Sequence, residues 1–297
     1  MTPPAPAIAP PADDTPAIDL VPASQFTIEE LVAAYNQTRV DYIVPMPMNT
    51  ARLREYVRNY DIDLDRSFVV RAGDQILGLA MLGVRPGHTW VTRLGIIPTQ
   101  RRCGAGQMLM EQLIAQSRRL KVSYVTLDVI QNNKPAHRLF SKLGFHEIRE
   151  LMVIRRPPAT PPNDVTIPPC YTVQNLSHRQ AAALLGQRQS VPSWLTENRS
   201  LVNAGNLAAL RVELESGGRG WLVYQKTIFQ LGRLVLQTEV GDPHQVCLAL
   251  IHALHTHNPA LDTKSENLPV QDPHWPAMQE LGYLESFRRI EMRLDLS

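Results

Sequence analysis

Residues 90–120 have the sequence WVTRLGIIPTQRRCGAGQMLMEQLIAQSRRL, in which three predicted elements follow one another. Apolar residues predict a strand from Trp90 to Ile97, and a turn rich in Arg and Gly follows from Thr99 to Gly106. The apolar residues after the turn recur at helical spacing as far as Leu120. The first N–H groups of a helix have no intrahelical acceptor, so a glycine turn between a strand and a helix is typical of an anion site.

Four residues of the turn strengthen this prediction. Gly104 and Gly106 have no Cβ that would hold a ligand away from the backbone. Arg101 and Arg102 add positive charge beside the helix start, where the macrodipole also favours an anion. We therefore expect the turn to bind a diphosphate.

The composition is that of a globular protein large enough for two domains. The chain has 297 residues and a net charge of +2, which is too near zero to indicate binding to nucleic acid or an anionic membrane. Residues 1–156 carry 19 Lys and Arg against 15 Asp and Glu, whereas residues 157–297 carry 11 against 13. The half that contains the glycine turn is therefore the more basic one.

Nothing in the sequence predicts export or a membrane span. No run approaches the roughly 20 apolar residues that a span requires, and the N-terminus lacks a basic region followed by an apolar one. Cys103, Cys170 and Cys247 are too far apart to predict a disulfide framework or a zinc site. We expect a cytoplasmic protein with reduced thiols.

The first half predicts a strand, two helices, three antiparallel strands, a helix, a strand, a helix and a closing strand from His146 to Arg155. Between the first two helices, prolines keep the apolar loop Tyr42–Met48 out of a helix. This loop either forms the wall of a pocket or packs on the core.

The second half repeats the first in outline, and Leu143-Gly144-Phe145 recurs as Leu281-Gly282-Tyr283 after 138 residues. The predicted class is α/β, with a mixed, mostly antiparallel sheet and flanking helices. Its predicted parts are a disordered Pro- and Ala-rich tail (1–17), a first domain (18–156), a Pro-rich linker (157–169) and a second domain (170–297). A predicted helix of the second half, His244–His257, carries His252, His255 and His257 near its end, and we expect these histidines to be solvated and not to bind a metal.

Two motifs of the first half together resemble the GNAT superfamily of acyl-CoA-dependent N-acyltransferases. The family pattern Q/R-x-x-G-x-G/A matches Arg101–Gly106. The pattern N-x-x-A-x-x-L-Y-x-x-x-G-F matches Asn133, Ala136, Leu139, Phe140, Gly144 and Phe145. The resemblance implies two tandem GNAT-like domains, of which the second is degenerate.

By this resemblance, acetyl-CoA is the co-substrate and its pantetheine arm lies where the strands Trp90–Ile97 and Tyr124–Ile130 diverge. The implied coenzyme-binding residues are Leu94, Gly95, Ile96, Ile97, Arg101, Arg102, Cys103, Gly104, Ala105, Gly106, Asn133 and Phe140. Gly95 predicts either a β-bulge at this gap or a notch for close packing.

The second half lacks these features at the corresponding positions. A shift of 138 residues replaces Arg101, Gly104 and Gly106 by Glu239, Asp242 and His244. Two carboxylates would repel a diphosphate. We therefore expect the second copy to bind no coenzyme A and to serve as structure, as an interface or as a lid.

The resemblance leaves the proton chemistry unassigned. Many GNAT enzymes have a Glu base near the start of the strand that precedes the loop, where this chain has Trp90 and Thr92, and Phe140 replaces the usual Tyr acid. Asp128 is the first candidate for a base, since a carboxyl group in a dry cleft can have a raised pKa. His88 and Tyr42 are the other catalytic candidates. Alternatively, Asp128 pairs with an arginine such as Arg93, His88 is a solvated turn residue, and Tyr42 packs the loop.

The sequence thus predicts an N-acyltransferase that moves an acetyl group from acetyl-CoA to a primary amine of a small molecule or peptide. One active site is expected, in the first domain, without a metal, nucleic acid or membrane. The alternative is a catalytically silent coenzyme A-binding sensor or assembly module. Whether the chain forms a homodimer is left open.

Overall fold

The computed structural model describes residues 17–160, 162, 165–169 and 171–296. The predicted tail over 1–17 lies outside the described residues except for Ala17, and the predicted linker over 157–169 is described only in part. Within these described ranges, no helix is long and apolar enough to cross a membrane.

The first half has the predicted order of elements. They are β1 (Ile18–Pro22), α1 (Ile28–Gln37), α2 (Thr50–Asn59), β2 (Ile62–Ala72), β3 (Gln75–Arg85), β4 (His88–Ile96), α3 (Ala105–Arg119), β5 (Tyr124–Ile130), α4 (Lys134–Lys142) and β6 (His146–Arg156). Local sequence explains where the helices begin: Thr27 and Glu30 form a capping box at the start of α1, and Asn49 caps α2.

The second half repeats this order. Its elements are β7 (Tyr171–Leu176), α5 (His178–Leu185), the short 3-10 helix η3 (Trp194–Thr196), α6 (Asn198–Ala204), β8 (Leu207–Leu214), β9 (Arg219–Lys226), β10 (Gln230–Val240), α7 (Pro243–His257), β11 (Asp262–Pro269), α8 (Trp275–Glu280) and β12 (Leu284–Asp295). The sheet is antiparallel except for the β4–β5 and β10–β11 pairs. The predicted class, mixed α/β with two tandem copies of one fold, is confirmed.

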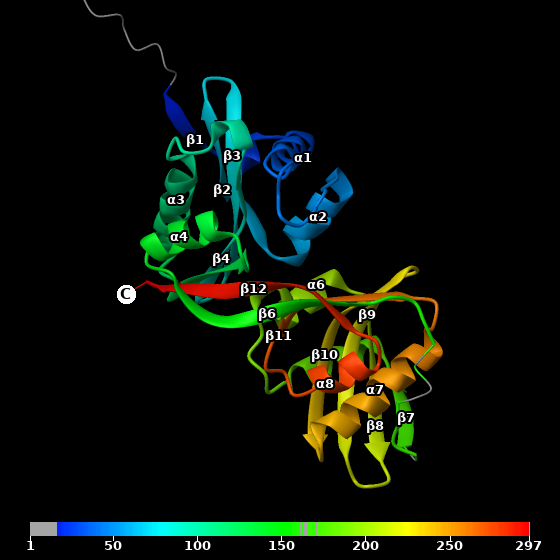
Figure 1. Ribbon diagram of the computed structural model, residues 1–297. Helices are drawn as coiled ribbons and strands as arrows, with labels where there is room; N and C mark the ends of the chain where they lie inside the picture. Colours follow the sequence, from blue (N-terminus) through cyan, green and yellow to red (C-terminus); the bar gives the residue numbers. More distant parts are fainter. Residues whose placement is uncertain (1–16, 161, 163–164, 170, 297) are drawn as a thin grey trace, which may run out of the picture.

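Among the described residues, the strands form one sheet of 12 strands in the order β1-β2-β3-β4-β5-β12-β6-β11-β10-β9-β8-β7. The predicted closing strand β6 therefore does not lie beside β5. The C-terminal strand β12 takes that place, and β6 pairs with β11 of the second half (Figure 1). Each half completes its sheet with the last strand of the other.

The two exchanged strands pair with each other about an approximate twofold axis. β6 and β12 are antiparallel, and Leu151 lies opposite Arg289. These two residues are 138 positions apart, which is the spacing that relates the two halves of the sequence. The exchange therefore brings equivalent residues of the halves together at the centre of the molecule.

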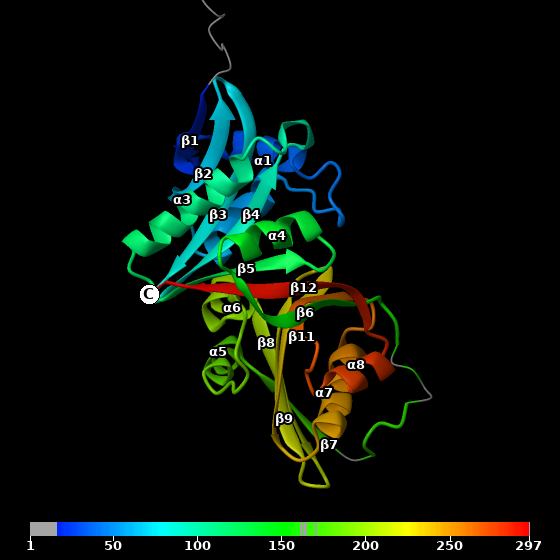
Figure 2. The same cartoon turned by 60° about the vertical axis from the view of Figure 1, so that its left-hand side comes forward.

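Helices cover both faces of the sheet. In the first half α3 and α4 lie on one face and α1 on the other (Figure 2). One buried cluster contains Leu109 and Phe140, and another on the opposite face contains Leu31 and Tyr35. Trp194 of the second half belongs to the latter cluster and is 2% exposed. The core of the first half is thus completed by the second.

The sequence pattern missed α6, α8 and the strand β11. The sequence of β11, DTKSENLP, is polar and shows no apolar alternation. It still forms a strand because β10 and β6 pair with it on either side. Three of its polar residues, Thr263, Ser265 and Asn267, are buried.

The prediction that the histidines near the end of α7 are solvated is wrong for His255. Its side chain is 1% exposed, and Nε2 lies 2.9 Å from Oη of Tyr283. Burial, together with the charge of Arg156, lowers the pKa of His255 to about 3. The imidazole is therefore a neutral part of the core.

Candidate active site

A cavity of about 550 Å³ lies beside the diverging strands β4 and β5, between the two halves of the chain. The first half contributes residues of α2, β4, β5 and α4, and the second half contributes residues of β10, β11 and β12. Tyr42 and Pro45–Met48 of the apolar loop also line it, so this loop does form the wall of a pocket.

The strands β4 and β5 are paired over only part of their length. Their parallel register runs from His88 and Tyr124 to Val91 and Leu127, and no further pair follows among the described residues. The stretch Leu94–Ile97 therefore has no strand beside it on the side of β5, and its first residue, Leu94, lines the cavity. Such an unpaired edge can accept an extended ligand as if it were another strand.

A β-bulge at Arg93 and Leu94 accompanies this divergence. Arg93 has a left-handed backbone, with φ of 57°. A Cβ on the next residue, Gly95, would lie 2.4 Å from Oγ1 of Thr38, and Arg39 donates a hydrogen bond of 2.8 Å to the carbonyl of Leu94. Gly95 therefore lies next to a bulge, and its missing Cβ also leaves room for Thr38 at the end of α1.

The glycine turn before α3 has the geometry of an anion site. Gly104 has φ of 86°, and no side chain of the described residues caps the helix that begins at Ala105. Ala105 is buried, and Gly106 is half-buried beside it. By contrast α7, the counterpart in the second half, is capped by Asp242, whose Oδ1 accepts a hydrogen bond of 3.2 Å from the backbone of His244.

The three residues before Gly104 are exposed, but only Arg101 is held by an ion pair. Its guanidinium donates two hydrogen bonds to Asp41, of 2.6 and 2.7 Å. These bonds lower the pKa of Asp41. Arg101 also donates to the carbonyl of Ile96 at 3.3 Å. It therefore ties the apolar loop to the glycine turn, whereas Arg102 and Cys103 face solvent.

Asn133 and Phe140 line the cavity from α4 and the residue before it. Oδ1 of Asn133 accepts a hydrogen bond of 3.4 Å from the backbone of Ala136 and caps the helix. Asn133 also borders a second cavity of about 300 Å³. Phe140 is 5% exposed and packs on Phe145, so it contributes an apolar surface.

Asp128 lies on β5, just beyond the stretch paired with β4, and lines the cavity. Its Oδ2 accepts a hydrogen bond of 3.4 Å from Asn267, and its Oδ1 is buried without a partner among the described residues. No ion pair joins it to Arg93, the partner suggested as an alternative. Burial raises the pKa of Asp128, although the charge of Arg289 opposes this.

A second buried carboxyl group lies beside Asp128. Glu291 of β12 is directly opposite Asp128 in the antiparallel β5–β12 pair, so their side chains share a face. Its Oε2 accepts a hydrogen bond of 2.6 Å from Arg149. Burial and the charge of Asp128 raise the pKa of Glu291 to about 7. Because the two carboxylates repel each other, they titrate as a pair.

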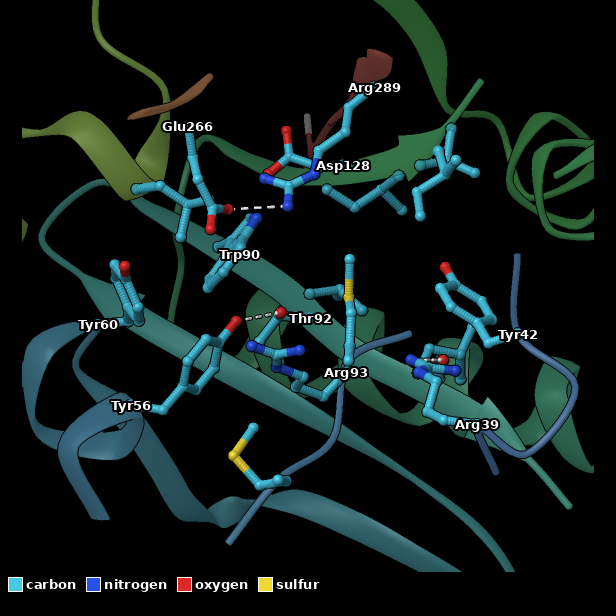
Figure 3. Close-up of a pocket in the computed structure, with 18 of the residues that line it drawn as sticks. Arg39, Tyr42, Tyr56, Tyr60, Trp90, Thr92, Arg93, Asp128, Glu266 and Arg289 are labelled. Atoms are coloured by element: carbon cyan, nitrogen blue, oxygen red, sulfur yellow. Dashed lines mark hydrogen bonds and ion pairs between the residues drawn. The ribbon is translucent and has the colours of Figure 1, made fainter. Parts of the chain in front are cut away.

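The other two catalytic candidates are not brought to Asp128. Nε2 of His88 lies 2.8 Å from Oε1 of Glu197, and its ring stacks on Tyr124. His88 joins the two halves and does not line the cavity, so we do not retain it as a base. Tyr42 lines the opposite end, where the guanidinium of Arg39 lies 4.3 Å from its ring (Figure 3).

Tyr56 was not predicted as a site residue, because a single Tyr at a helix end carries no recognisable pattern. Its Oη lies 2.6 Å from Oγ1 of Thr92 (Figure 3). Burial raises the pKa of Tyr56 to about 12, although Arg93 opposes this, so the hydroxyl keeps its proton at neutral pH. Trp90, at the other expected base position, stacks on Trp194. Its buried indole N–H makes no well-aligned hydrogen bond among the described residues, but it lies near Asp128 and lowers the pKa of that carboxyl group against the effect of burial.

Four charged residues from the second half also line the cavity: Arg233, Lys264, Glu266 and Arg289. Arg289 donates a hydrogen bond of 2.8 Å to Glu266, and Lys264 lies 3.4 Å from the same carboxylate. Burial alone would raise the pKa of Glu266, but Arg289 and Lys264 lower it to about 2. Figure 3 shows Glu266 and Arg289 beside Asp128.

Comparisons with known proteins agree with these features. Residues 31–145 match the model of the acetyltransferase (GNAT) family. The ribosomal protein bS18-alanine N-acetyltransferase of Haemophilus influenzae is 26% identical over 125 residues, which are 42% of this chain and 81% of that protein. The resemblance of the first half to the GNAT acetyltransferases is thereby confirmed.

Solved GNAT structures resemble the whole chain in fold. A tandem GNAT protein from the clavulanic acid biosynthesis pathway has a TM-score of 0.61 at 16% identity, and the likeness covers 94% of this chain and 98% of that one. A GCN5-related N-acetyltransferase from Sphaerobacter thermophilus has a TM-score of 0.66 at 18% identity, over 94% and 95%. These structures confirm the predicted tandem fold, and the family match together with the N-acetyltransferase relative confirms the acetyltransferase class.

GNAT enzymes use acetyl-CoA, and the first half of this chain fits such a ligand. The unpaired edge Leu94–Ile97 suits an extended arm, and the uncapped start of α3 suits a diphosphate. The left-handed Gly104 sets the turn between them. The family match ends at Phe145, inside the first half.

Proposed function

We propose that this GNAT enzyme transfers an acetyl group from acetyl-CoA to a primary amine of a small molecule or peptide, at a single site in the first half. The observation that carries this proposal is that the unpaired edge of β4 and the carboxyl group of Asp128 border one cavity. A thioester held along that edge would present its carbonyl to an amine beside Asp128.

The coenzyme would be bound mainly by backbone. Leu94–Ile97 would pair with the pantetheine arm, and the N–H groups from Cys103 to Gly106 would bind the diphosphate. Asn133 and Phe140 would contact the arm from α4. Acetyl-CoA supplies the activated acetyl group, and the chain supplies orientation and proton transfer.

Asp128 would take the proton of the attacking amine through Oδ1, which has no partner among the described residues. Tyr56 would act as the proton donor in place of Phe140, which has no hydroxyl. The hydroxyl of Tyr56 is protonated at neutral pH. Trp90 and Thr92 would then serve as supports of these two groups.

The second half would bind no coenzyme A. Asp242 already accepts a hydrogen bond from the backbone N–H of His244 at the start of α7, and Glu239 is held by Arg211 and Arg219 at 3.1 and 3.0 Å. A diphosphate would have to displace or approach these carboxylates.

We also propose that the chain divides into two domains, residues 18–156 and 170–297.

Release of free thiol from acetyl-CoA, measured across a panel of primary amines, tests the activity. Calorimetric titration with coenzyme A tests the number of sites. We expect amine-dependent thiol release and one equivalent of coenzyme per chain. Tight coenzyme binding without thiol release on any amine would favour the sensor alternative, and two equivalents would contradict the single site.

A further inference from the structure

The part of the cavity next to Asp128 carries an excess of positive charge. We call its basic side chains the basic pocket; they are Arg93, Arg233, Lys264 and Arg289. Two carboxyl groups lie beside these basic side chains. They are Asp128, whose pKa is raised by burial, and Glu266, whose pKa is lowered to about 2. Four basic side chains therefore face two carboxyl groups in this part of the cavity.

Glu266 is shared between several cations. It accepts a hydrogen bond from Arg289 and lies 3.4 Å from Lys264, and the charge of Arg93 also stabilises its ionised form. One carboxylate therefore offsets the charge of three basic groups.

Arg93 and Arg233 make no salt bridge within the described parts of the chain. Arg93 donates to Oη of Tyr35 at 2.8 Å, its guanidinium lies 4.1 Å from the ring of Tyr56, and its Nε is buried without a partner. Arg233 donates to Gln225 at 3.1 Å and lies over the ring of Tyr60. Neutral groups thus orient these two cations without compensating their charge.

Arg233 occupies in the second half the place that Arg93 occupies in the first. Both have a left-handed backbone, with φ of 57° and 54°, at bulges of the corresponding strands β4 and β10. The strands β10 and β11 also diverge after three paired positions. The gap that would bind coenzyme in a complete second copy therefore supplies Arg233 and Lys264 to the shared cavity.

Partly desolvated cations that lack counter-ions repel one another, and an anionic ligand relieves this repulsion. Guanidinium groups also match the planar oxygens of carboxylates and phosphates. We propose that the basic pocket binds an anionic group of the acyl acceptor, a carboxylate or a phosphate, so that the substrate is an amine that also carries an anion. The inference rests on the proposed function in naming this ligand as the acceptor.

Binding of matched amines to the full-length, coenzyme A-loaded protein tests the inference without requiring turnover. One pair is L-lysine and cadaverine, which differ by a carboxylate, and the other is O-phosphoethanolamine and ethanolamine, which differ by a phosphate. We expect calorimetry to show at least tenfold tighter binding of the anionic member in one pair, and that pair identifies the anion. The Arg233→Gln and Lys264→Gln variants should each reduce this preference several-fold.

Arg118→Gln is the matched control, because it removes one positive charge from an exposed site at the far end of α3. It should keep the wild-type preference. Equal binding within both pairs, or a preference that survives in both pocket variants, would overturn the inference. Thiol release with uncharged and anionic amines alike would support the proposed function and contradict the inference. Absence of release on every amine, with the binding preference intact, would contradict the proposed function and the naming of the ligand as the acyl acceptor, but it would leave the anion site itself supported.

Discussion

The carboxyl group of Asp128 is surrounded by side chains from both halves. Asn267 of β11 donates to one oxygen, Glu291 of β12 lies opposite in the strand pair, and Arg289 supplies positive charge. Asp128 itself belongs to β5. The acid–base properties of this residue are therefore set by the exchange of strands.

We expect Asp128→Asn to lower the rate of acetyl transfer about 100-fold or more, because the amide cannot accept the amine's proton. In the wild type the rate should rise with pH through the raised pKa of Asp128, since the base must be ionised. That acid limb should disappear in the variant. Asp74→Asn, on the exposed β2–β3 turn, is the control. An unchanged rate and pH profile would remove Asp128 from the mechanism.

Glu291→Gln should change how stability depends on pH. Folded Glu291 keeps its proton up to a pKa of about 7, whereas the unfolded chain releases it near 4.5. Between these values the folded state binds more protons, so the free energy of unfolding falls as pH rises, by at most about 3 kcal/mol. The variant should flatten this slope in urea unfolding from pH 5 to 8. The exposed Glu213→Gln should not, and equal slopes in all three proteins would refute the assignment.

At the scale of elements, the two helices α3 and α7 begin differently although they occupy equivalent places. The start of α3 has a left-handed Gly104 and no side-chain cap among the described residues, while Asp242 caps α7. A capping carboxylate typically stabilises a helix by about 1 kcal/mol. The first half forgoes this stabilisation and leaves its N–H groups available to a ligand.

Gly104→Ala should weaken coenzyme A binding about tenfold, a cost of about 1.4 kcal/mol, because a Cβ strains the turn and its N–H groups shift. Gly87→Ala is a close match, since Gly87 has φ of 85° and, like Gly104, nothing within 4 Å of an added Cβ. Both variants should lose similar stability in urea. Only Gly104→Ala should raise the dissociation constant in calorimetry, and equal effects of the two variants on binding would rule out the turn as the anion site.

At the scale of the whole molecule, the halves share a sheet and a core. β12 lies between β5 and β6, and Trp194 packs so closely that a Cβ on Gly83 would lie 2.6 Å from it. Arg85, whose side chain is 2% exposed, bonds to Glu197 and to Asp61 at 2.7 and 2.8 Å. Breaking such a buried pair costs about 3–5 kcal/mol, so separation of the halves is strongly opposed.

We therefore expect the chain to unfold in a single transition. Leu113→Ala removes a buried side chain from the first half and Leu250→Ala from the second, and both leucines are 0% exposed. Each should cost about 2–5 kcal/mol and shift the same urea transition, observed by circular dichroism and by tryptophan fluorescence. Two transitions, each shifted by only one of the variants, would show that the halves fold independently.

The sequence alone predicts the order of elements in the first half, the repeat and the glycine turn. These depend on local signals: apolar periodicity, turn residues and the absence of Cβ atoms act within a few residues of one another. The predicted strand Tyr124–Ile130 therefore coincides with β5. Asp128 is the candidate base on that strand because a carboxyl group beside a dry cleft can have a raised pKa.

Only the tertiary structure decided what surrounds that residue. β11 has no apolar pattern because its two neighbouring strands, and not its own sequence, make it a strand. The exchange of β6 and β12 depends on pairing between residues about 140 positions apart, for which no local signal exists. In the assembled fold, His88 contacts Glu197 of the second half, and Lys264, Glu266 and Arg289 line the cavity. The charge of the site is thus a property of the assembled halves, because electrostatic interactions depend on distance in space and not on separation in sequence.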